Sequence, residues 1–175
     1  MYLVSVYFDE QTDKKIRNLI NHVGEKTGNS FMVDNHVPPH ITVAAIETRH
    51  ENEAIESLEQ IAGELEKGII QWVSVGTFFT QVIFIQPVLN EYLHNLLVNI
   101  CDNLTKIPDT IISPFYQPFS WLPHCTICKQ MSKEQMNEAY QVLQNKFTPF
   151  KGEVVKIGIA KTNPHRDIKV WKLKR

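Results

Sequence analysis

A proline–histidine–x–threonine motif occurs twice in this chain, and the second copy follows the first at an offset of 84 positions. The copies span 39–42 and 123–126. The same offset relates two helix-start signals and two lysine–glycine pairs: Thr48 and Glu51 to Ser132 and Gln135, and Lys67-Gly68 to Lys151-Gly152. One offset shared by a motif, a capping signal and a turn predicts two copies of one strand–helix–strand–helix–strand unit. We therefore expect residues 1–175 to form a single bilobal domain with an internal duplication.

Hydrophobic periodicity along the chain predicts alternating strands and helices, and hence a mixed α/β fold. The expected strands lie near 2–8, 40–46, 69–75, 80–86, 124–128, 153–161 and 168–173. The expected helices cover about 10–27 and 89–105, and two more begin at the capping signals, the second ending near 147. A turn is expected at 163–167. The second copy has a longer connection before its motif, 107–122, which is rich in aromatic residues.

Strand geometry brings the histidine and the threonine of each motif to the same side of the sheet. Residues i and i+2 of a strand share a face, so His40 projects with Thr42, and His124 with Thr126. If a twofold axis relates the copies, both pairs face one cleft. We expect the other histidines to be surface or locally bonded residues: His22, His36, His50, His94 and His165.

Two imidazoles on either side of a phosphate can catalyse acid–base phosphodiester chemistry without a metal. The pKa of a free histidine is near 6.5, so at neutral pH one ring can be neutral while the other is protonated. The neutral ring takes a proton from water or from a ribose hydroxyl, and the protonated ring gives one to the leaving oxygen. The threonine hydroxyls can donate to the non-bridging phosphate oxygens. The sequence does not say which histidine is the acid.

Composition narrows the class of protein further. The chain is 43% hydrophobic and 21% charged, with no apolar run long enough for a membrane helix and no signal-peptide pattern at the N-terminus, so we expect a cytoplasmic protein. A net charge of −1 argues against a general polyanion binder. Positive charge is concentrated in residues 151–175, which contain eight Lys and Arg but only two acidic residues. This basic hairpin either holds an anionic substrate or protects a sheet edge.

The three cysteines give little support for a metal or redox site. Cys125 and Cys128 form a C-x-x-C, but on a strand their thiols should point to opposite faces. No second cysteine pair completes a zinc site, and neither motif has a further ligand at metal spacing. We expect no metal and no other cofactor, although a metal hydrolase that uses the same histidines remains an alternative.

The paired His-x-Thr motifs resemble those of the 2H phosphoesterase superfamily, and the chain is similar to its bacterial 2′-5′ RNA ligase-like, cyclic phosphodiesterase branch. The resemblance implies a bilobal α/β fold: two antiparallel-sheet lobes related by a pseudo-twofold axis, with helices outside and a central cleft. It implies His40 and His124 as acid and base, and Thr42 and Thr126 as phosphate ligands. It also implies hydrolysis of 2′,3′-cyclic phosphates or 2′-5′ phosphodiester bonds in RNA ends or nucleotides. We expect a monomer.

Two further expectations concern the substrate. Tyr116 and Trp121 are candidates to stack a nucleobase, whereas Phe115 and Phe119 serve at least as well as caps of the core. A non-catalytic module that binds nucleotides or RNA ends on the same fold is the alternative to an enzyme.

Overall fold

The computed structural model describes residues 1–162 and 166–174 of the chain. The strands are β1 (Tyr2–Phe8), β2 (Ile41–Glu47), β3 (Gly68–Phe78), β4 (Val82–Pro87), β5 (Ile111–Ile112), β6 (Cys125–Lys129), β7 (Phe150–Lys161) and β8 (Arg166–Lys172). The α-helices are α1 (Glu10–Thr27), α2 (Phe31–Asp34), α3 (Glu51–Glu64), α4 (Glu91–Leu104) and α5 (Lys133–Lys146), and Pro114–Tyr116 forms a 3₁₀ turn. The expected mixed α/β class is confirmed. The short elements α2, β5 and the 3₁₀ turn were not expected, and residues 163–165 of the expected turn lie outside the described part.

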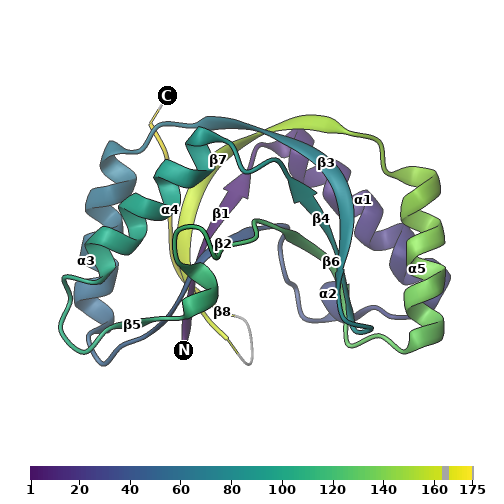
Figure 1. Cartoon of the computed structure of the whole chain (residues 1–175), viewed down its shortest axis with the longest axis horizontal. Coiled ribbons are helices and arrows are strands. Elements are labelled where there is room, and N and C mark those ends of the chain that lie inside the picture. Colours follow the sequence, from purple (N-terminus) through teal and green to yellow (C-terminus); the bar gives the residue numbers. More distant parts are fainter. Residues whose placement is uncertain (163–165, 175) are drawn as a thin grey trace.

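All paired strands run antiparallel in one continuous sheet whose order is β5-β2-β1-β7-β3-β4-β6, with β8 paired to β7. The sheet is strongly curved and forms an arch (Figure 1). Apart from β5 and β8, the order maps onto itself when β2, β1 and β7 are exchanged for β6, β4 and β3. This symmetry supports the proposed duplication. The resemblance implied an antiparallel sheet in each lobe, and hydrogen bonds between β3 and β7 join the two into one sheet.

The helices cover the two halves of the sheet in pairs, and Figure 1 shows one pair at each end of the arch. Helices α3 and α4 pack together on the half that holds β2 and β7, whereas α1 and α5 pack on the half that holds β4 and β6. Helix α1 therefore belongs by sequence to the first copy but covers strands of the second.

The helix ends follow from local sequence, with one exception. The Asp9 side chain accepts hydrogen bonds from the backbone of the first turn of α1, and Gly28 ends this helix at φ 69°. Ser132 and Gln135 form the expected capping box of α5. The capping box expected at Thr48 and Glu51 is wrong. The N-cap of α3 is His50, two residues after Thr48, and the Thr48 hydroxyl accepts a hydrogen bond from the His50 backbone N–H instead.

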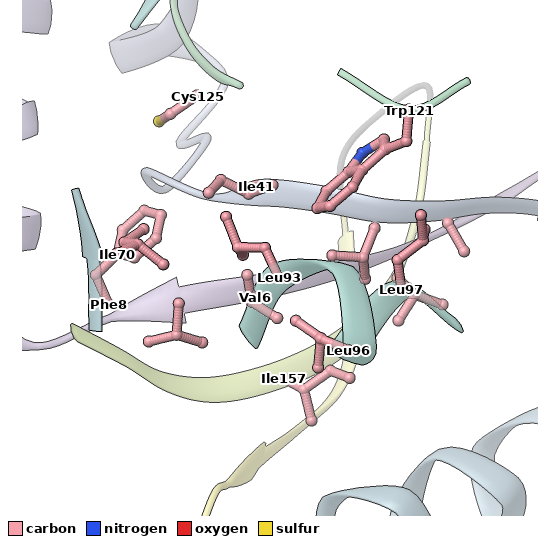
Figure 2. Packing of buried hydrophobic residues seen from close by; sticks show 14 of the residues in the cluster. Val6, Phe8, Ile41, Ile70, Leu93, Leu96, Leu97, Trp121, Cys125 and Ile157 are labelled. Carbon is pink, nitrogen blue, oxygen red and sulfur yellow. The ribbon is translucent and has the colours of Figure 1, made fainter. Parts of the chain in front are cut away.

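The core lies between the sheet and the helices. Figure 2 shows Val6, Ile41 and Ile157 from three neighbouring strands against Leu96 and Leu97 of α4. All five residues are at most 1% exposed. This packing fixes the strand β2 that carries the first motif.

Candidate active site

Each motif sits at the start of a short strand. Strand β2 begins directly after His40, and β6 begins directly after His124. Thr42 pairs with Ser5 on β1, and Thr126 pairs with Phe84 on β4. The two motif strands therefore occupy equivalent positions in the two halves of the sheet.

A β-bulge follows the threonine in each motif strand. The pairing of β2 with β1 passes from Thr42 to Ala44 and skips Val43, and the pairing of β6 with β4 skips Ile127 in the same way. A bulge re-aims the residues that follow it. The fifth residue after each histidine is Ala45 in one strand and Lys129 in the other.

One cavity of about 420 Å³ brings the four motif residues together. Its lining comprises Met1, Leu3, Phe31, Met32, Asn35, Val37, His40, Thr42, Tyr116, His124, Thr126, Lys129 and Thr162. Residues from both halves of the chain thus face one space. Its volume falls in the range of small-molecule sites.

The imidazole rings of the two motif histidines are held by equivalent contacts to the backbone. Nδ1 of His40 lies 2.7 Å from the Pro38 carbonyl oxygen, and Nδ1 of His124 lies 2.8 Å from the Leu122 carbonyl oxygen. A carbonyl only accepts, so each Nδ1 carries a hydrogen and donates it. Nε2 is then the nitrogen of each ring whose proton can come and go.

The two histidines differ in what surrounds them. The His124 ring centroid lies 4.8 Å from that of Phe78 and 5.1 Å from that of Phe84. Burial lowers the pKa of His124 below its ordinary value of 6.5, against the hydrogen bond to Leu122 O, which raises it. The ring of Tyr7 is a neighbour of His40, with the two ring centroids 6.4 Å apart.

Cys125 links the two motifs behind the cavity. Its thiol accepts a hydrogen bond from the His40 backbone and is 1% exposed. Burial nevertheless raises the thiol pKa to about 12, so the group stays protonated and is not a nucleophile. Cys125, Cys128 and Cys101 are free and buried.

The aromatic residues of 107–122 lie differently from the expectation. Tyr116 lines the cavity, but Trp121 is only 6% exposed, packs in the core and donates from Nε1 to the Thr42 carbonyl oxygen at 3.0 Å (Figure 2). A buried indole has no face for a base, so stacking by Trp121 is a wrong expectation. Phe115 and Phe119 do not cap the core, because they are 76% and 93% exposed.

Lys129 is a cavity residue that sequence reasoning missed. Its Nζ lies 4.6 Å from the centre of the Phe31 ring, and the Asn29 side chain donates to its carbonyl oxygen. The only signal in the sequence was a lysine five residues after His124. Regular alternation would have turned it away from the threonine, and the bulge at Ile127 was not visible.

Within 1–162 and 166–174, no three His, Cys, Asp or Glu side chains are grouped closely enough to share a metal ion. In the same part of the chain, no helix is both long enough and apolar enough to cross a bilayer.

Several solved structures share this fold. A crystal structure described as a phosphoesterase has a TM-score of 0.64 at 14% identity over 99% of this chain and 98% of its own. LigT of E. coli with 3′-AMP gives the same four values. TT0787 of Thermus thermophilus has a TM-score of 0.64 at 12% identity, over 98% of this chain and 97% of its own.

Sequence comparison assigns the family. The profile of the 2′-5′ RNA ligase superfamily matches residues 12–166, so the chain belongs to this superfamily of 2H phosphoesterases. The resemblance drawn from the two motifs is thereby confirmed. None of the curated proteins compared with this chain matches it in sequence.

Proposed function

We propose that this chain is a metal-independent phosphodiesterase that acts on 2′,3′-cyclic phosphates or 2′-5′ phosphodiester bonds of RNA ends or nucleotides. His40 and His124 are its general acid and base, and Thr42 and Thr126 bind the phosphate. The observation that carries the proposal is the single cavity lined by all four side chains.

The cavity also suits an anion. Two threonine hydroxyls can donate to non-bridging phosphate oxygens, and Lys129 adds positive charge beside them. Family membership and the LigT structure with 3′-AMP support a nucleotide or an RNA end as the substrate. Tyr116 lines the same cavity and can stack on the base.

The environment of His124 favours it as the base. Its lowered pKa keeps the ring neutral at pH 7, ready to take a proton from water. The water oxygen then attacks phosphorus, the bond from phosphorus to the leaving oxygen breaks, and protonated His40 gives its proton to that oxygen. The threonine and lysine donors stabilise the charge that builds on the phosphate in the transition state.

The first test replaces each histidine. H40A and H124A should each lower kcat for 2′,3′-cyclic AMP by about 10²–10⁴-fold, since each removes a general acid or base. H22A is the matched control, because His22 is an exposed residue of α1 bonded to the Asn18 carbonyl oxygen. Its kcat should stay within about twofold of wild type. Full activity of H40A or H124A would overturn the assignment.

Two further outcomes separate the alternatives. Activity in EDTA is expected, and its loss would favour a metal hydrolase built on the same histidines. Tight binding of 2′,3′-cyclic AMP with no release of 2′- or 3′-AMP by the wild-type protein would instead favour the non-catalytic binding module.

A further inference from the structure

A second hollow of about 470 Å³ opens beside His40, and nothing in the proposed reaction yet uses it. It is lined by Tyr7, Phe8, Asp9, Glu10, Asp13, Arg17, Pro38, Val155, Lys156, Asp167 and Val170. These residues come from the end of β1, the first turns of α1, the segment before β2, and strands β7 and β8. The hollow is similar in size to the catalytic cavity.

The hollow adjoins the catalytic cavity through His40. The Pro38 carbonyl that holds the His40 ring belongs to a lining residue of the hollow, and the Tyr7 ring, also in the lining, is the neighbour at 6.4 Å. Leu3 and Tyr7 share one face of β1, because residues i and i+4 of a strand do so. Leu3 lines the catalytic cavity and Tyr7 lines the hollow, so side chains on one face of β1 reach both spaces.

The charges around the hollow are largely committed to the protein. Asp9 accepts bonds from the backbone of Gln11, Thr12 and Glu153, and Asp13 pairs with Arg17 at 2.5 Å. Tyr7 donates to Asp167 at 3.2 Å.

The sign of the charge selects the ligand. Among the described residues that line the space, four are carboxylates and two are cations, so their net charge is negative. A second phosphate would be repelled there. Ribose hydroxyls, by contrast, donate well to carboxylates. The apolar side chains of Val155 and Val170 and the face of Tyr7 suit a sugar or a base edge.

We propose that this hollow is a second subsite that binds an uncharged nucleoside attached to the leaving oxygen of the scissile phosphate. The inference rests on the proposed function and extends it, since a cyclic phosphate alone would leave the subsite empty. The substrate that fills both spaces is a diester with a nucleoside on each side and no further phosphate on the leaving side.

The position of the subsite also assigns the acid and base roles of the two histidines. The leaving nucleoside lies beside His40, so His40 gives its proton to the 5′ oxygen as the bond from that oxygen to phosphorus breaks. His124 takes a proton from the water whose oxygen bonds to phosphorus. The products are a 2′-phosphate on one side and a nucleoside with a free 5′ hydroxyl on the other.

The test compares two substrates, adenylyl-(2′→5′)-adenosine and 2′,3′-cyclic AMP. V170F places a large ring in the hollow, and V88F makes the same change at Val88, an exposed residue after β4. The ratio of kcat/KM for the dimer to that for the cyclic nucleotide should fall at least tenfold in V170F. In V88F it should stay within twofold. An unchanged ratio in V170F would overturn the subsite.

The charge argument has its own test. A phosphate on the 3′ hydroxyl of the leaving adenosine should raise KM of the dimer severalfold in the wild-type protein, and E10K should reduce that penalty. E25K, at the far end of α1, is the control and should keep the penalty. A phosphorylated dimer that binds the wild type as well as the plain dimer would contradict the proposed selectivity.

One measurement separates this inference from the proposed function. Free adenosine should shift the methyl NMR signals of Val155 and Val170 in the wild-type protein, whether or not any substrate turns over. Turnover of 2′,3′-cyclic AMP without such shifts would refute the subsite but leave the proposed function intact. Shifts without turnover of either substrate would refute the proposed function but leave the subsite intact.

Discussion

At the scale of single residues, the two motif histidines share a hydrogen bond to the backbone but differ in the side chains around the ring. Each Nδ1 is bonded to the carbonyl of the residue two positions earlier, which sets the tautomer in both rings. The rings of Phe78 and Phe84 lie against His124, and burial lowers the pKa of His124. In the proposed mechanism this environment suits His124 to the role of the base.

This difference predicts how activity depends on pH. Because burial lowers the pKa of His124, a base at this position loses its proton at a lower pH than a free histidine does, so the acidic limb of kcat/KM should lie below pH 6.5. F78A lets water reach the ring, so the pKa should rise toward its ordinary value and the limb should move to higher pH. An NMR titration of the His124 Cε1 proton measures the pKa directly.

The control is F79A, since Phe79 is the next residue and is 94% exposed. F79A should change neither the pKa of His124 nor the pH of the acidic limb of kcat/KM. A downward shift in F78A, or equal shifts in both variants, would show that the phenylalanine wall does not set the pKa.

At the scale of elements, two equivalent glycines let helices approach strands of the other copy. A Cβ at Gly152 on β7 would meet Thr12 Oγ1 of α1 at 2.6 Å, and a Cβ at Gly68 on β3 would run into the Tyr92 ring of α4. These are the glycines of the repeated lysine–glycine pairs. In each case the first helix of one copy packs closely on the third strand of the other, α1 on β7 and α4 on β3.

Replacement of these glycines should therefore destabilise the fold. G68A and G152A should each lower the free energy of unfolding by about 1–3 kcal/mol, because overpacked sites must shift backbone or side chains. G63A is the control: no atom lies within 4 Å of its added Cβ in helix α3. It should be neutral or stabilise by up to about 1 kcal/mol. Urea unfolding measures all three, and an equal effect in all would refute the packing argument.

At the scale of the whole molecule, the seam between β3 and β7 makes the two halves one sheet. Trp72 on β3 pairs with Phe150 on β7, stacks on its ring at 6.1 Å and is fully buried. Two ion pairs, Lys161 with Glu51 and Lys169 with Glu59, tie β7 and the basic hairpin to α3. These two lysines are thus paired with carboxylates of α3.

We expect the two halves to unfold together. A variant that keeps only Trp72, and another that keeps only Trp121, report on the seam and on the core around β2 respectively. Within each variant, tryptophan fluorescence and far-UV circular dichroism should give one urea midpoint. Separate midpoints for the two probes would contradict a single cooperative domain.

The sequence by itself determined what depends on local spacing. The histidine and threonine of each motif were identifiable because a strand repeats every two residues, and the long helices were identifiable from their apolar stripes and, for α5, from its capping box. The mixed α/β class followed from the order of these elements.

Tertiary structure alone decided what depends on contacts between distant segments. Bulges at Val43 and Ile127 arise from pairing with β1 and β4, and only the bulge at Ile127 turns Lys129 toward the cavity. Trp121 is buried because its indole finds the Thr42 carbonyl, 79 residues away in the chain. Local periodicity carries no information about such partners, because the energy of burial and of a long-range hydrogen bond is set by whichever segment the fold brings alongside.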